Sequence, residues 1–216
     1  MEVVLETIFS FSGDYNFTNR QVCREFRELA PKVDSLEYLN QAIHDGYKPE
    51  NFTPTSELAD AALDRGLLSL LESCNDFVPE DICEKAAGKG YLHILKWARV
   101  QRYPWDYKVC SEAAYNGHLK VLQWLKDNNC PWSAYTFLSA VAGGHLDILQ
   151  WCKEQDCPVD GNNCRIAACF GQLDVLKWCV EQGYPIDVNA YRDASIKKHK
   201  HIIQWLEEIG IERPDM

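Results

Sequence analysis

The sequence has no long apolar segment and no excess of basic residues. No run of about 18 apolar residues occurs, the minimum for a membrane-spanning helix. The N-terminus lacks the basic region and apolar core of a secretory signal. Aspartate and glutamate number 32 against 22 lysines and arginines, a formal net charge of −10. Because nucleic-acid phosphates require a basic face, the charge disfavours a general nucleic-acid binder. The missing membrane span and secretory signal lead us to expect a soluble, intracellular protein of the cytoplasm or nucleus.

Sequence motifs of catalysis are also missing. There is no phosphate loop, no Ser-His-Asp order and no His-Glu-x-x-His motif. His118 and His145 follow glycines at equivalent positions of a repeated segment, and Tyr91 and Gln172 take their place in sister copies. A position that accepts tyrosine or glutamine has a structural role. We therefore expect no enzymatic activity and no cofactor.

What the chain does contain is a segment repeated four times between residues 81 and 187. Glycine and tryptophan each recur with a step of 27 residues. The positions are Gly90, Gly117, Gly144 and Gly171, and Trp97, Trp124, Trp151 and Trp178. A period in this range, held without a gap, is the signature of a stacked repeat array.

Each copy predicts two short helices. An alanine-rich stretch such as 110–116 favours close packing, because alanine has little bulk and the highest helix propensity. Glycine then ends the first helix in a left-handed turn. The second helix, as in 119–126, has an apolar and a polar face, and proline follows it. Two helices this short cannot bury their apolar faces alone, so neighbouring copies must pack together.

This pattern resembles the ankyrin repeat. The helical part of that motif is matched by Ala113, Gly117, His118, Leu119, Val121 and Leu122. An ankyrin repeat has about 33 residues, so about six are missing here, after Ser133, where the family forms a β-turn finger. The resemblance implies an all-α fold: an ankyrin-like helical solenoid of paired antiparallel helices with short or absent β-turn fingers, spanning residues 35–216.

Ten cysteines are present, but no Cys-x-x-Cys pair. Phe137, Tyr103 and Leu125 stand where sister copies have cysteine, so these are packing positions at which a free thiol acts as a small hydrophobe. We expect buried thiols in a reducing compartment and no metal site. The recurring tryptophans are expected in the core or between copies, and Trp105 and Trp132 in inter-repeat packing.

The array extends beyond its regular part. Residues 35–79 are interpreted as a degenerate region, with a helix at 36–43 and an incomplete copy around Gly66 that has lost its tryptophan. Residues 188–216 keep the 27-residue step, but Lys198 replaces the glycine. Their polar Lys-Lys-His-Lys-His run at 197–201 is expected in a C-terminal cap, and the alternative is a site for an acidic partner.

Residues 1–34 do not follow the repeat and predict two short helices. The segments 8–11, Ile-Phe-Ser-Phe, and 22–29, Val-Cys-Arg-Glu-Phe-Arg-Glu-Leu, resemble the two ends of an F-box, a module that docks on the Skp-type adaptor of cullin ubiquitin ligases. The resemblance implies these adaptor-binding residues: Leu5, Ile8, Phe9, Phe11, Val22 and Phe26. It also implies a eukaryotic or viral setting, since such F-box/ankyrin proteins are typical of large DNA viruses, amoebae and algae. The alternative is a plain N-terminal cap.

A partner-binding surface is implied by the ankyrin resemblance, because exposed first-helix residues line the concave face of such arrays. These positions differ between copies, whereas the core positions repeat. The candidates are Lys85, Lys89, Glu112, Tyr115, Asn116, Ile166, Phe170, Ile196 and Lys197. An exposed Phe170 beside Ile166 is typical of a binding hot spot, and the alternative is that Phe170 packs on a neighbouring repeat.

Two functional hypotheses follow from the sequence. The first is a monomeric protein-interaction scaffold that binds a protein on its concave face and, through residues 1–34, acts as a substrate receptor of a cullin-type ubiquitin ligase. The second is a stand-alone recognition or effector module with no ligase link, whose N-terminal helices form only a cap.

Overall fold

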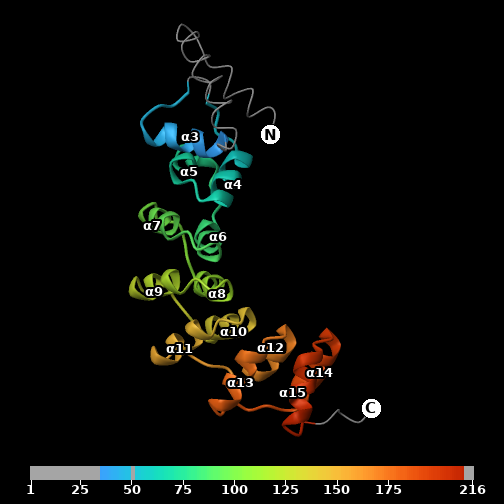
Figure 1. The fold of residues 1–216 in the computed structure, drawn as a ribbon. Coiled ribbons are helices and arrows are strands. Elements are labelled where there is room, and N and C mark those ends of the chain that lie inside the picture. Colours follow the sequence, from blue (N-terminus) through green and yellow to red (C-terminus); the bar gives the residue numbers. More distant parts are fainter. Residues whose placement is uncertain (1–34, 50–51, 212–216) are drawn as a thin grey trace. The chain divides into compact units, whose positions relative to one another are not determined.

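The computed structural model describes residues 35–49 and 52–211, and all regular elements in this part of the chain are helices (Figure 1). No strand occurs among the described residues. The predicted all-α class is thereby confirmed. The proposed adaptor-binding residues of segment 1–34 lie outside the described residues. The chain divides into two units, residues 1–79 and 80–216.

The described part of the first unit, residues 35–49 and 52–79, contains three α-helices and a short 3-10 turn. They are α3 (Ser35–His44), α4 (Ser56–Arg65), α5 (Leu68–Ser73) and η1 (Asn75–Phe77). Helix α5 packs against both α3 and α4. The Asn40 side chain accepts a 3.0 Å hydrogen bond from the backbone N–H of Leu70, which links α3 to α5. Thr55 caps α4 by accepting from the backbone N–H of Leu58.

Up to residue 211, where its described part ends, the second unit is built of five helix pairs (Figure 1). The first helices are α6 (Ile82–Gly88), α8 (Tyr107–Tyr115), α10 (Ala134–Gly143), α12 (Asn163–Phe170) and α14 (Val188–Lys197). The second helices are α7 (Leu92–Val100), α9 (Leu119–Asp127), α11 (Leu146–Glu154), α13 (Leu173–Glu181) and α15 (Lys200–Glu208). Each first helix packs on its own second helix and on the first helix of the next copy.

The core lies between the two helices of each pair and between copies. The alanines of the first helices are its smallest members, and Ala113, Ala140 and Ala167 are fully buried. Ile94, Leu122 and Leu149 of the second helices are fully buried as well. Small residues on one helix and large ones on the other allow close approach without a void, which is the packing that the alanine-rich pattern predicts.

Short loops connect one copy to the next, without any strand. Each begins with a residue in the left-handed region, namely Arg102, Asn129, Asp156 and Gly183. Three of the following first helices are then capped by a side chain that accepts from a backbone N–H: Asp106, Ser133 and Asp187 do this for α8, α10 and α14. The predicted absence of long fingers agrees with these connections.

A recurring side-chain contact sets the spacing between copies. In four copies the residue before the second helix reaches back to a carbonyl oxygen at the end of the first helix of the preceding copy. At this position His145 donates to the Tyr115 carbonyl and Gln172 to the Ala142 carbonyl, each at 3.0 Å. His118 and His199 make the same contact with Gly88 and Cys169. The bonds satisfy carbonyls that a helix end leaves without a partner, which is the structural role expected of these histidines.

Glycine is required beside this contact. Gly117 has φ 81°, and a Cβ built on it would lie 2.6 Å from the His145 ring. Gly144 has φ 85°, and its Cβ would lie 2.5 Å from the Gln172 side chain. Both the left-handed backbone and the close neighbour exclude a side chain here.

Candidate functional site

The exposed side of the five first helices is the candidate site, and we call it the first-helix face. Its predicted members Lys85, Lys89, Tyr115, Asn116, Phe170, Ile196 and Lys197 are exposed, whereas Glu112 and Ile166 are half-buried. Buried residues of the same helices, such as Cys110 and Ala113, point into the core. The face is therefore formed by the residues that differ from copy to copy.

Two of the predicted residues meet on this face although they lie two copies apart in the array. The rings of Tyr115, at the end of α8, and Phe170, at the end of α12, form an edge-on contact with centroids 6.5 Å apart. Tyr115 is 43% exposed and Phe170 is 46% exposed. The ring that Phe170 contacts thus belongs to a helix two copies away, and about half of each side chain remains open to solvent.

The contact is possible because α10, which lies between them in the stack, has small residues at its end. Ala142 and Gly143 occupy the positions that hold Tyr115 and Asn116 in α8. A Cβ on Gly143 would lie 2.2 Å from the backbone oxygen of Tyr115, so the two helices approach as closely as glycine allows. The aromatic pair therefore crosses the face over the small residues of α10.

A second aromatic pair lies at the other end of these helices and was not predicted. Tyr107, the first residue of α8, and Tyr135 of α10 have ring centroids 5.7 Å apart. Their side chains are 39% and 62% exposed. The sequence signal that could have indicated an uncharged surface here is α10, Ala134–Gly143, which contains no charged residue.

We call the two aromatic pairs and the α10 residues that share their helix face the aromatic band. Its exposed members are Tyr107, Tyr135, Tyr115 and Phe170, and α10 adds the half-buried Leu138 and the buried Ala142. Exposed aromatic rings held in place by contact with each other lose little conformational entropy when a partner covers them.

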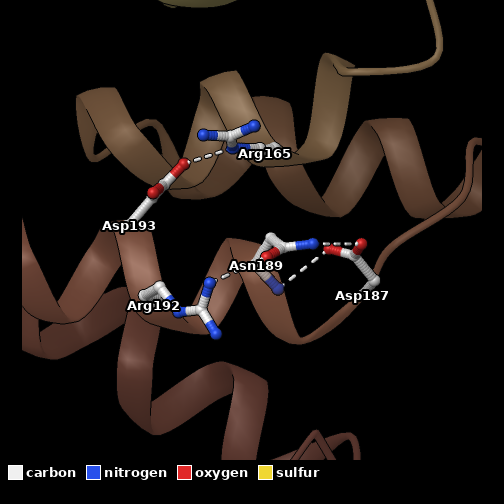
Figure 2. A network of polar contacts seen from close by, with 5 residues as sticks. All are labelled: Arg165, Asp187, Asn189, Arg192 and Asp193. Atoms are coloured by element: carbon white, nitrogen blue, oxygen red, sulfur yellow. Dashed lines mark hydrogen bonds and ion pairs between the residues drawn. The ribbon is translucent and has the colours of Figure 1, made fainter. Parts of the chain in front are cut away.

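A polar network includes the pair Arg165–Asp193, which links α12 to α14 (Figure 2). Arg165 Nε donates to Asp193 Oδ2 at 2.6 Å, and this hydrogen bond and the carboxylate charge raise the pKa of Arg165. Asn189 donates to Asp187 from its backbone and its side chain, at 2.9 and 2.7 Å, and accepts from Arg192 at 3.4 Å. The pair Arg165–Asp193 was not identified from the sequence. The available signal was that these opposite charges lie 28 residues apart, one repeat and one further residue.

Three of the predicted polar residues on α6 and α8 have partners on their own helices or caps. Lys85 pairs with Asp81 at 3.1 Å. The Asn116 amide donates to the Glu112 backbone carbonyl at 2.9 Å and also lies 3.4 Å from its carboxylate. These three predicted members of the face are therefore held locally, whereas Ile196 is 67% exposed on α14.

The chemistry of the other reactive groups is that of a packed core. Eight of the nine described cysteines are buried and all nine are free, which confirms the predicted buried thiols. Burial raises the pKa of Cys83 to about 11, and a hydrogen bond with Cys157 together with burial also raises the pKa of Cys152. In the described part of the chain no three histidine, cysteine or acidic residues converge as metal ligands.

The tryptophans line the second helices. Trp105 and Trp132, from the loops, meet Trp124 and Trp151 of the next second helix edge-on, at 6.0 and 5.8 Å, as inter-repeat packing predicts. Of the recurring tryptophans, Trp97 is buried, whereas Trp124, Trp151, Trp178 and Trp205 are only partly covered. The expectation was a place in the core or between copies, and the contacts of Trp124 and Trp151 with the loop tryptophans are of the second kind.

No described helix has both the length and the apolar character needed to cross a membrane.

Comparison with protein-family models and with curated proteins gives no significant match. Among solved structures, the chain is similar to the human ASB11 ankyrin repeat domain, with a TM-score of 0.52 at 14% sequence identity. The alignment covers 71% of this chain and 84% of that domain. At this identity the likeness concerns the fold, and it confirms the predicted ankyrin-like helical solenoid.

Proposed function

We propose that this protein is a non-enzymatic scaffold that binds another protein on its first-helix face. The observation that carries the proposal is the aromatic band, with the exposed Tyr115–Phe170 contact at its centre. Aromatic side chains that are preorganised and solvent-exposed are enriched at the hot spots of protein interfaces.

Other occupants of the face fit less well. A small molecule needs a concave pocket that covers most of its surface, whereas Tyr135 and Phe170 stand on an open helical surface. A nucleic acid needs a row of basic residues, but α10 has none and the chain has a net charge of −10. An open, uncharged, aromatic surface suits a protein chain.

Affinity capture from eukaryotic cells tests the proposal. The full chain and its Phe170→Asp variant are captured in parallel, and bound proteins are compared by quantitative mass spectrometry. We expect a defined set of partners to be lost with Phe170→Asp, because a buried carboxylate at the centre of an interface has no compensating charge. Binding of each such partner is then measured with the purified chain.

Val100→Asp is the matched control. Val100 is 76% exposed at the end of α7, on a second helix, so the substitution makes the same change of charge away from the first-helix face. Both variants must retain the helical circular dichroism of the parent. Equal retention of all partners by the Phe170 and Val100 variants would refute the proposed site.

The link to a ubiquitin ligase is a separate proposal that rests on the F-box resemblance of residues 1–34. A chain with Ile8 and Phe9 changed to serine is expected to lose a Skp-type adaptor and a cullin while it keeps the partners of the first-helix face. If the parent chain recovers no adaptor, the second hypothesis holds, and the protein is a stand-alone recognition module whose N-terminal helices are a cap.

A further inference from the structure

Three neighbouring lysines cluster on one side of the aromatic band. At the end of α14, Ile196 is followed by Lys197 and Lys198, and Lys200 begins α15. All three lysines are exposed, and among the described residues no carboxylate forms an ion pair with them. We call these three residues the lysine edge.

The carboxylates of the same repeat are directed elsewhere. Asp193 is only 17% exposed at its side chain and is bound to Arg165. Glu207 accepts a 2.8 Å hydrogen bond from the Tyr191 hydroxyl and, like Glu208, lies at the far end of α15. A nine-residue helix is about 13 Å long, more than a Debye length at physiological salt, so these acids do not neutralise Lys200.

The opposite side of the band has no comparable excess. There Lys85 is neutralised by Asp81. Glu112 adds a negative charge near the end of α8, next to Tyr115. Lys108, at the start of α8, is an exposed single lysine. The charge of the face is thus asymmetric in its clustering, with three neighbouring unpaired lysines at the end of α14 and the start of α15 and a carboxylate, Glu112, near the end of α8.

Resting on the proposed function, we infer that the partner presents an aromatic or large aliphatic side chain to the aromatic band and acidic residues to the lysine edge. The occupant is an acidic, apolar-anchored segment of another protein. Charge complementarity fixes the direction in which it lies, because its acidic end meets the lysine edge and not Glu112. In a chain of net charge −10, most of the surface repels such a segment, which confines it to this place.

Selection from a displayed library of random peptides tests this inference with the full chain as the target. We expect the enriched peptides to combine aromatic or large aliphatic residues with aspartate or glutamate. Synthetic copies of the enriched peptides are then measured by fluorescence anisotropy at low and at high salt. Affinity is expected to fall with salt, since exposed charge pairs are screened.

Two variants separate the charge from the apolar anchor. The double variant Lys197→Glu and Lys200→Glu is expected to lower the affinity about tenfold at low salt, and less at high salt. The matched control is Lys96→Glu with Lys120→Glu. It changes the net charge equally, places one glutamate in the first turn of a second helix as Lys200→Glu does, and leaves the first-helix face intact. The control is expected to retain the affinity within about twofold.

The outcomes also distinguish this inference from the proposed function. If binding of the enriched peptides depends on Phe170 but is indifferent to the lysine edge, or if the peptides are not acidic, the binding face stands and the acidic partner is refuted. If no peptide is enriched, or if the enriched peptides bind the Phe170→Asp variant equally well, both are overturned. Acidic peptides that need both Phe170 and the lysine edge support both.

Discussion

The junctions between copies and the first-helix face differ in how they use the same repeat. At the junctions the chemistry is constant: the side chain before a second helix donates to the preceding first helix at 3.0 Å in each of four copies. On the face the chemistry changes at every step. One position holds Gly88, Tyr115, Ala142, Cys169 and Ile196 in successive copies.

This difference shows where the constraint on the molecule lies. A junction residue contacts two copies, so a change there disturbs both the helix end and the stack. A residue on the face contacts mainly solvent, so substitutions cost little stability and leave room for binding. Substitutions at the two regions should therefore separate stability from partner binding.

The largest effect on stability is expected for Phe137→Ala. Phe137 is fully buried, and its ring lies near those of Trp178 and Tyr184, at 6.4 and 6.0 Å. Truncation leaves a cavity and should lower the free energy of unfolding by about 3–5 kcal/mol, measured by urea denaturation. Tyr135→Ala on the first-helix face, where the ring is 62% exposed, is the control and should cost less than about 1 kcal/mol. Similar losses for both would contradict the distinction between core and face.

The junction is tested by Gly144→Ala against Gly183→Ala. Both glycines have left-handed backbones, φ 85° and 80°. A Cβ on Gly144 meets the Gln172 side chain at 2.5 Å, whereas Gly183 has open space. Each variant should lose about 1–2 kcal/mol for the backbone, and Gly144→Ala about 1–3 kcal/mol more for the forced displacement.

Adding Gln172→Ala to Gly144→Ala sharpens this comparison. The smaller side chain removes the clash but also the hydrogen bond to the Ala142 carbonyl. In urea denaturation of the four species of this double-mutant cycle, the double variant should be more stable than the sum of the two single losses predicts. Strict additivity would mean that the two side chains do not meet.

Stabilisation is expected from Asn163→Val. Asn163 is fully buried, and neither its Oδ1 nor its Nδ2 has a hydrogen-bond partner in the structure. Ile82 and Val109 occupy the same repeat position. Removing an unsatisfied buried amide should raise the free energy of unfolding by about 1–3 kcal/mol.

Thr136→Val is the counterpart at the equivalent position of α10. Thr136 accepts a hydrogen bond from the backbone N–H of Ser133, so its loss should destabilise the chain by about 0.5–1.5 kcal/mol. Destabilisation by Asn163→Val as well would contradict the prediction, because it would mean that the Asn163 amide makes a stabilising hydrogen bond.

Alkaline pH should weaken the core. Burial raises the pKa of the Cys83 thiol from 9.0 to about 11, so the unfolded chain loses this proton before the folded chain does. The contribution to stability is therefore complete below about pH 9 and declines as the pH rises toward 11. Urea denaturation at several pH values should show this decline, and Cys83→Ala should reduce its slope. An unchanged slope would place the titration at another group.

The smallest effect on stability is expected for Phe170→Ala. The ring loses its edge-on contact with Tyr115, but about half of it is already exposed. The free energy of unfolding should change by less than about 1 kcal/mol. Partner binding, in contrast, should fall by more than tenfold if Phe170 is a hot spot. A large loss of stability would move Phe170 from the face to the structural core.

Much of the fold was predictable because the repeat states it several times. The recurring glycines, tryptophans and alanines specify helix ends and packing positions. Because four copies can be compared, the role of each position can be assigned more reliably than from a single copy. Phe137 stands at the repeat position that holds cysteine in sister copies, which indicated that the position is buried, and both Phe137 and the cysteines are buried in the structure. The degenerate region at 35–79 has one incomplete copy and offers less of this evidence.

The face was predictable in outline and not in detail. The exposed positions of the first helices follow from helical periodicity, and their use by a partner stays a prediction. The contact of Arg165 with Asp193 and the isolation of the Asn163 amide had no repeated signal to reveal them. Each occurs once, and a single occurrence carries no internal comparison.

The sequence by itself determined the 27-residue period, the succession of paired helices and the chemistry of their core, because these depend on local propensity and on a pattern repeated along the chain. Only the tertiary structure decided which of the varying residues meet. Tyr115 reaches Phe170 because α10 places small residues between them and glycine lets α8 approach closely. Such a contact depends on the distance and angle between stacked helices, which no local pattern in the sequence records.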